Sequence, residues 1–239
     1  MTSAPVKRIQ LIDALRGLAV VLMVVHHFLY DLVVFLGAPA WLFSNPVFDL
    51  LHYIFAGLFI TLSGVSSRFS RSNVKRGIKV LLAALAITLV TTFLQMPIRF
   101  GVLHLLGFCM VFYGLTHRLW DGAPRLFSLA LYAAMTVITA LVVHFVPLDT
   151  RVLWMFGWTY PGFFSADYFP IFPWLFVFLF GTTLGAYIRE NRFPRWFYEL
   201  SPPLFPSVGR HAFIIYLVHQ PVLYGITALI GLALGTRIW

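Results

Sequence analysis

Seven long apolar runs divide the chain, and each is a candidate for crossing a lipid bilayer as a helix, although the fourth is short. Within hydrocarbon a spanning segment must satisfy its own backbone, so helices or a closed barrel are the available structures. Charged residues make up 10% of the chain, against about 25% in an average soluble domain. We therefore predict an all-α, polytopic helical membrane protein with a single transmembrane domain over residues 1–239. The expected spans are residues 9–31, 47–66, 76–96, 100–117, 126–147, 169–188 and 210–235.

Glycine gives two further predictions about these helices. The fourth run contains Gly101, Gly107 and Gly114, so we expect it to tilt, to line a cavity or to cross only part of the bilayer. Two glycine pairs, Gly181 with Gly185 and Gly231 with Gly235, have the four-residue spacing that lets two membrane helices pack closely.

The basic residues lie mainly in short loops between the apolar runs. The formal net charge of +9 would suggest a nucleic-acid partner for a soluble domain, but these positions fit the positive-inside rule instead. No Lys or Arg lies between the first two runs, whereas the next loop contains Arg68, Arg71, Lys75 and Arg76. This alternation predicts a multi-pass membrane protein with a cytoplasmic N-terminus, surrounded by lipid and without a nucleic-acid partner.

The first run carries an unusual number of ionisable groups, namely Asp13, Arg16, His26, His27 and Asp31. Such groups are costly in hydrocarbon and usually mark a functional pathway. At 1.5 Å rise per residue, Arg16 and His27 lie about 16 Å apart along a helix, and His27 and Asp31 share a face. One helix therefore places a cation near one membrane surface and a His–Asp pair toward the other.

A neutral histidine beside a carboxylate can act as a general base, because the carboxylate fixes the tautomer and stabilises the imidazolium. His27 and Asp31 are the candidates for these two roles. The alternative is structural: Asp31 ends the helix in water, and His27 is a buried histidine with satisfied hydrogen bonds.

Four segments place His, Asp or Arg beside Gly or Pro within apolar sequence. They are LIDALRGLAVVLMVVHH at 11–27, IRFGVLHLLG at 98–107, DYFPIFPWLFVFLFG at 167–181 and VGRHAFIIYLVHQPV at 208–222. In this order they resemble a bacterial family grouped with the lysosomal heparan-α-glucosaminide N-acetyltransferase, within a wider superfamily of transmembrane acyltransferases. The first segment is also similar to integral-membrane O-acetylating enzymes, in which a histidine follows an arginine after ten residues, as His27 follows Arg16.

The resemblance implies transfer of an acyl group, typically acetyl from acetyl-CoA, to a hydroxyl or amine of an extracytoplasmic saccharide. It also implies a location in a bacterial inner membrane. It favours His27 and Asp31 as catalytic residues and leaves His26 as the other candidate of the doublet. Direct transfer and a covalent acyl-histidine both remain open. The chain is shorter than the lysosomal relative and has fewer expected spans.

Arg16, with Asp13 one turn earlier, is the candidate for binding the phosphates of a cytoplasmic acyl-CoA, since guanidinium binds phosphate through two hydrogen bonds. Arg68 and Arg71 are further candidates for the same anion. The simpler alternatives are an ion pair that seats the first helix and loop charges that set topology.

Six residues of the other segments are candidates for binding the acceptor. His219 and Gln220 precede Pro221, which bends a helix and frees a carbonyl. The others are His104, Asp167, Tyr168 and Trp174. Helix–helix hydrogen bonds and a plain N-cap are the structural alternatives for His104 and Asp167.

Two other functions compete with acyl transfer. Intramembrane Asp and His also suit a proton-coupled transporter, although no inverted repeat is visible. A non-catalytic membrane partner subunit is the third possibility, and a homodimer is compatible with all three. We expect no metal site, because the eight histidines show no HxxxH or HExxH spacing.

Overall fold

The computed structural model describes residues 8–148 and 150–235, and in this part of the chain the regular elements are helices. Seven of the helices in these ranges are long and apolar enough to cross a membrane. The predicted all-α, polytopic architecture is therefore confirmed. The chain divides into two compact units, Met1–Phe59 with Phe193–Trp239 (unit 1) and Ile60–Arg192 (unit 2).

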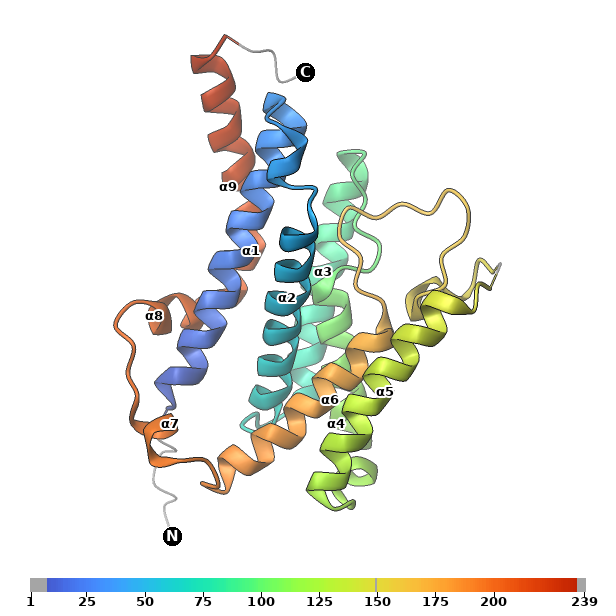
Figure 1. Cartoon of the computed structure of the whole chain (residues 1–239), viewed down its shortest axis with the longest axis vertical. Coiled ribbons are helices and arrows are strands. Elements are labelled where there is room, and N and C mark those ends of the chain that lie inside the picture. The colour runs from blue at the N-terminus through green and yellow to red at the C-terminus, as the bar shows by residue number, and fades with distance from the viewer. Residues whose placement is uncertain (1–7, 149, 236–239) are drawn as a thin grey trace. The chain divides into compact units, whose positions relative to one another are not determined.

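Unit 1 combines the two ends of the chain. Its elements are α1 (Gln10–Leu36), η1 (Ala40–Leu42), the first part of α2 (Pro46–Ser67), α7 (Arg195–Glu199), α8 (Phe205–Arg210) and α9 (Ala212–Ala233). Helices α1 and α9 lie side by side, and the short α8 packs against α1 (Figure 1). The first and last spans of the sequence thus form one helix pair.

Helix α1 is longer than its predicted span of residues 9–31. It continues past Asp31 to Leu36 and ends at Gly37, which has a left-handed φ of 67° and donates its N–H to the carbonyl of Leu32. Glycine is the usual residue at this position because it carries no Cβ. Asp31 consequently lies inside the helix, fully buried, and does not end it in water.

Unit 2 contains the middle of the chain. Its elements are the end of α2, α3 (Asn73–Phe93), α4 (Val102–Asp121), α5 (Arg125–Phe145), η2 (Leu153–Phe156) and α6 (Ile171–Arg189). Helix α3 packs along α4, and α5 packs along α6 (Figure 1). Helix α4 has 20 residues, so its glycines do not shorten it below the length of a full span.

The end of α2 and α6 meet at glycines. A Cβ added to Gly64 would collide with the carbonyl oxygen of Phe178, and one added to Gly181 would collide with that of Thr61. Gly185 faces the backbone of Val65 in the same way. The predicted role of Gly181 and Gly185 in close helix packing is therefore confirmed, and this packing fixes the end of α2 from which Arg68 projects. The same prediction is wrong for Gly235, because a Cβ added there would meet nothing within 4 Å.

Candidate functional site

The four sequence segments meet in two pairs. The first and fourth form the α1–α8–α9 contact of unit 1, where a Cβ on Gly17 would collide with the carbonyl oxygen of Phe205, and one on Gly209 with that of Asp13. The second and third meet in unit 2, where the N–H of Phe169 donates to the carbonyl of Phe100 at 2.8 Å. Each pair therefore forms a polar site of its own.

Asp13 lies at the start of α1 and is buried between two arginines. Its carboxylate accepts hydrogen bonds from Nε of Arg8 at 2.5 Å and from Nη1 of Arg16 at 3.0 Å. The hydrogen bond and the charge of Asp13 raise the pKa of Arg8. The predicted phosphate ligand Arg16 thus already makes an i, i+3 ion pair, as its structural alternative requires.

His27, in the middle of α1, touches His219 of α9 edge to face, with ring centroids 4.9 Å apart. Nδ1 of His27 lies 2.9 Å from the carbonyl oxygen of Met23, and Nδ1 of His219 lies 2.6 Å from that of Tyr216. A carbonyl only accepts, so each Nδ1 carries a proton and the lone pair of each neutral ring is on Nε2. Both histidines are therefore fixed in the tautomer that a general base acting through Nε2 needs.

Asp31 lies one turn after His27 but hydrogen-bonds to α9. Its Oδ1 accepts from Nε2 of Gln220 at 2.9 Å. Within the described part of the chain, its Oδ2 has no hydrogen-bond partner, and the same is true of Oε1 of Gln220. The carbonyl of Met23, and not Asp31, orients the imidazole of His27. Asp31 remains a predicted catalytic residue, with Gln220 as its contact.

The doublet His26–His27 points in two directions. The ring of His26 packs against Phe43 and His52, with centroid distances of 4.7 and 4.6 Å. His27 instead contacts α9. The two histidines of the sequence motif consequently face different surroundings, and only His27 adjoins the Asp31–Gln220 pair.

In unit 2, Asp167 caps the start of α4. Its Oδ2 accepts from the backbone N–H of Val102 at 3.0 Å, and a Cβ on Gly101 would collide with that same carboxylate. A carboxylate at a helix start satisfies a free N–H and interacts favourably with the helix dipole. Asp167 precedes the predicted sixth span of residues 169–188, but the helix start that it caps is that of the fourth span.

His104 is held by a chain of two hydrogen bonds. Oγ1 of Thr88 donates to the carbonyl of Ile98 at 2.5 Å and lies 3.1 Å from Nε2 of His104. A hydroxyl has one proton, so Nε2 of His104 must be the donor in the second bond. This arrangement ties α3 to α4, as the structural alternative for His104 requires.

The two remaining acceptor candidates of unit 2 lie near α6. The hydroxyl of Tyr168 donates to the carbonyl of Trp154 at 2.5 Å, and burial raises the pKa of Tyr168 to about 12. The indole of Trp174 packs on Phe169 with a centroid distance of 5.4 Å. Neither contact reaches the second segment, because Trp154 belongs to η2 and Phe169 lies with Trp174 in the third segment.

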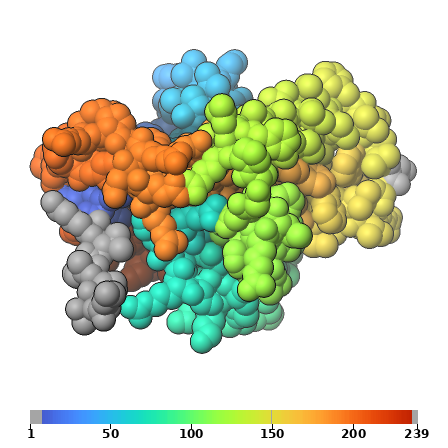
Figure 2. Space-filling model, turned by 90° about the horizontal axis from the view of Figure 1, so that it is seen from below, coloured from blue at the N-terminus to red at the C-terminus, as the bar shows by residue number. Residues whose placement is uncertain are grey.

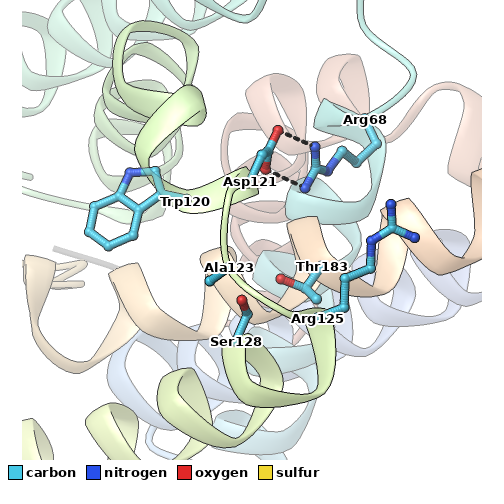
Figure 3. A pocket seen from close by; sticks show the side chains of 7 residues that line it. All are labelled: Arg68, Trp120, Asp121, Ala123, Arg125, Ser128 and Thr183. Atoms are coloured by element: carbon cyan, nitrogen blue, oxygen red, sulfur yellow. Dashed lines mark hydrogen bonds and ion pairs between the residues drawn. The ribbon is translucent and has the colours of Figure 1, made fainter.

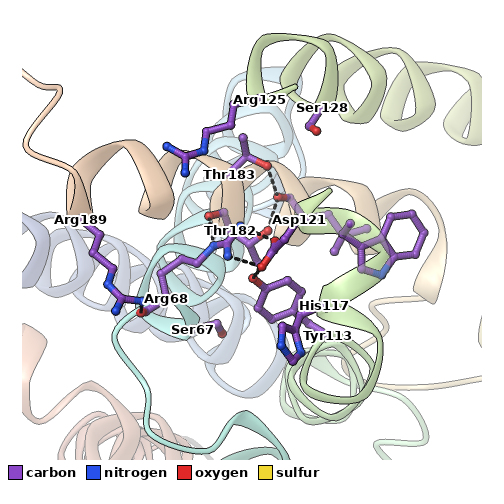
Figure 4. Close-up of polar contacts among 12 residues, drawn as sticks. Ser67, Arg68, Tyr113, His117, Asp121, Arg125, Ser128, Thr182, Thr183 and Arg189 are labelled. Atoms are coloured by element: carbon purple, nitrogen blue, oxygen red, sulfur yellow. Dashed lines mark hydrogen bonds and ion pairs between the residues drawn. The ribbon is translucent and has the colours of Figure 1, made fainter. Parts of the chain in front are cut away.

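Arg68 is the centre of a polar cluster at the other end of unit 2. Its guanidinium makes two hydrogen bonds to Asp121, at 2.5 and 2.6 Å, and its Nε donates to the carbonyl of Thr182 at 2.9 Å (Figure 4). Tyr113 lies under the guanidinium and donates to the same carboxylate. The donors of Arg68 are thus committed to protein groups, whereas Arg71 is exposed.

A cavity of about 130 Å³ adjoins this cluster (Figure 3). Arg125, Ser128 and Thr183 line it with Arg68 and Asp121 (Figure 3). In Figure 2 the end of α4 and the start of α5, in lime green, lie next to the α2–α3 connection, in teal. The other residues that line the cavity are Trp120 and Ala123.

Sequence reasoning missed this cavity and the role of Asp121 in it. A signal was present, because the chain has only eight acidic residues and Asp121 lies between Arg118 and Arg125. Over the described ranges, no group of three or more His, Cys, Asp or Glu side chains is arranged to hold a metal ion.

In the described part of the chain, seven apolar helices with buried His and Asp side chains define a multi-pass membrane protein with polar sites between its spans. The profile of the family described as "Heparan-alpha-glucosaminide N-acetyltransferase, catalytic" matches residues 8–221. The chain therefore belongs to this family of acetyltransferases, as the four segments predicted. Searches of curated proteins and of solved structures found no match.

Proposed function

We propose that the protein transfers an acetyl group from acetyl-CoA to a hydroxyl or amine of an extracytoplasmic saccharide, with His27 as the general base. The observation that carries this proposal is the hydrogen bond from Nδ1 of His27 to the carbonyl of Met23, at 2.9 Å. It leaves the lone pair of the neutral ring on Nε2. This histidine lies on the first helix of a chain that belongs to an acetyltransferase family.

The proposed reaction is a direct acyl transfer. Nε2 of His27 takes the proton from the O–H or N–H of the saccharide while the oxygen or nitrogen of that saccharide group attacks the carbonyl carbon of the thioester. Collapse of the tetrahedral intermediate breaks the C–S bond, and the imidazolium returns the proton to the CoA sulfur. The products are the acetylated saccharide and free CoA. Asp31, one turn away, favours the transient imidazolium through its charge.

The donor is expected at the start of α1. Arg16 and Asp13 remain the predicted donor-binding pair there, and the positive-inside pattern predicts that this end faces the cytoplasm. Arg71 is exposed and is available to a phosphate. For Arg68 to bind one, its two hydrogen bonds to Asp121 must exchange for phosphate contacts.

The acceptor is expected beside His27. His219 and Gln220 adjoin it in unit 1, and this contact supports their predicted part in acceptor binding. The predicted acceptor contacts of unit 2 stay predictions, and they are His104, Asp167, Tyr168 and Trp174.

The test is acetyl transfer by the purified, detergent-solubilised protein, measured as CoA thiol release and as acetylated product over a panel of amino and neutral sugars. Acetyl-CoA is expected to raise the unfolding midpoint more than unrelated nucleotides do, because a ligand of the native state stabilises it. Replacing His27 with Ala is expected to abolish transfer without lowering the yield of folded protein. Unchanged turnover in His27→Ala contradicts the assignment of the base. Proton or solute flux into proteoliposomes without acetyl-CoA would favour a transporter.

A further inference from the structure

The α1–α9 contact contains a set of buried polar atoms that all lack a partner. They are Oδ2 of Asp31, Oε1 of Gln220 and Nε2 of His219, none of which has a hydrogen-bond partner among the residues that the structure describes. Asp31 is fully buried and His219 is 9% exposed. Buried polar atoms in proteins are ordinarily hydrogen-bonded, so three such atoms on one helix contact mark a place where a polar ligand or water binds.

With the carboxyl of Asp31 ionised, all three atoms are hydrogen-bond acceptors. The amide nitrogen of Gln220 already donates to Oδ1 of Asp31, so the remaining amide atom is the carbonyl oxygen. The Nδ1 proton of His219 is used by the carbonyl of Tyr216, so Nε2 of the neutral ring presents a lone pair. The group that fits this set must therefore supply hydrogen atoms.

This chemistry excludes two kinds of occupant. A phosphate or carboxylate would place acceptor against acceptor, so the set does not suit the phosphates of CoA. For the same reason it cannot stabilise the oxyanion of a tetrahedral intermediate, which needs donors. Hydroxyl and amine groups of the acceptor meet the requirement.

The position of the set relates it to the proposed base. Asp31 follows His27 by four residues, which is about 6 Å along the helix and on the same face. His219 touches His27 directly. An acceptor whose reacting group lies at Nε2 of His27 thus has a neighbouring substituent within reach of the Asp31–Gln220 pair.

We propose that Asp31, Gln220 and His219 form a recognition subsite for a hydroxyl adjacent to the reacting group, so that the protein selects acceptors with two vicinal hydrogen-bond donors. This inference rests on the proposed function, because it takes His27 as the place of reaction. Asp31 and Gln220 are specificity residues in this account. The hydrogen bond between them holds their two unpartnered oxygens as one unit.

The test uses matched small acceptors, trans-1,2-cyclohexanediol against cyclohexanol and trans-2-aminocyclohexanol against cyclohexylamine. For the wild-type protein, kcat/KM for each compound with two vicinal donors is expected to exceed kcat/KM for its single-donor analogue by a ratio of at least about ten, since a site built to bind a hydroxyl rejects an analogue without it. In Asp31→Asn an N–H₂ donor replaces the acceptor Oδ2, and the ratio is expected to fall toward one.

The control variant is Thr227→Val, which also removes a buried hydroxyl without a described partner from α9. Thr227 lies seven residues beyond Gln220, about 10 Å along the helix, so the ratio is expected to keep its wild-type value. The proposal would be overturned by a wild-type ratio near one. It would also be overturned if Asp31→Asn lowered kcat/KM by the same factor for the vicinal compound and for its single-donor analogue.

Thermal stabilisation by the diol and by cyclohexanol, measured without acetyl-CoA, separates this inference from the proposed function. Greater stabilisation by the diol in wild type but not in Asp31→Asn supports the subsite even where no acetyl transfer is found, which would contradict the proposed function alone. Equal stabilisation by the two alcohols, as for a site that holds only water, overturns the subsite and leaves the proposed function standing.

Discussion

The hydroxyl of Thr88 offers a measurable test of how α3 and α4 are held together. Thr88→Val keeps the shape of the side chain and removes both hydrogen bonds of Oγ1, to the carbonyl of Ile98 and to Nε2–H of His104. His104 is 6% exposed, so its N–H loses its partner without gaining water, at a cost of about 1–3 kcal/mol. Ile98 is half-buried and regains part of its bond from water. We expect a total loss of about 2 kcal/mol.

For a chain of this length such a loss lowers the unfolding midpoint by roughly 4–8 °C. The assay is the thermal midpoint of the detergent-solubilised protein, followed by tryptophan fluorescence. The matched control is Thr92→Val on the same helix, because Thr92 is exposed and its hydroxyl bonds to the carbonyl of Thr88 in its own helix. Midpoints of the two variants that agree within about 1 °C would refute the assignment of a cross-helix hydrogen bond.

Three further predictions concern other parts of the chain. Arg68→Lys loses the bidentate hydrogen bond to Asp121 and is expected to destabilise the protein by about 1–2 kcal/mol in a thermal melt. Arg71→Lys, at an exposed position, is expected to leave the melting temperature nearly unchanged. Gly209→Ala is expected to lower the melting temperature because its Cβ meets a backbone carbonyl, whereas Gly225→Ala, with nothing within 4 Å, is expected to raise it slightly; equal shifts would contradict the close helix contact. The hydrogen bond and charge of Arg125 lower the pKa of the Glu190 carboxyl. The stability that this ion pair contributes is therefore present at neutral pH and is lost as the pH falls below the ordinary value of 4.5. Between pH 6 and 3.5 the melting temperature is expected to decline less in Glu190→Gln than in wild type.

The class of fold follows from the sequence because it depends on hydrophobicity and length. The pattern predicted seven spans, and the described helices differ from them by a few residues at most ends. The largest difference is at the end of the first span, where α1 continues beyond Asp31 to Leu36. The breaker that ends the helix, Gly37, was visible in the sequence, but a buried carboxylate inside a span cannot be distinguished from an exposed one at its end without tertiary contacts.

The site was predictable in composition but not in connectivity. The sequence singled out His27, Asp31, His219 and Gln220, and these residues lie together in unit 1. It predicted an Asp31–His27 contact from their spacing on one helix, whereas Asp31 bonds across to α9 and the carbonyl of Met23 orients His27. Spacing along one helix shows which residues share a face, but it does not show which neighbouring helix covers that face.

The most direct test of the central claim compares three histidine variants of the purified protein in acetyl transfer from acetyl-CoA. His27→Gln is expected to lower kcat/KM by at least about 100-fold, the usual effect of losing a general base, and by more than His26→Gln. His117→Gln is the control, because His117 is exposed on α4 and its Nδ1 likewise bonds to a carbonyl of its own helix, that of Gly114, at 3.2 Å. A kcat/KM for His27→Gln equal to that for His117→Gln, in protein that remains folded, would contradict the account.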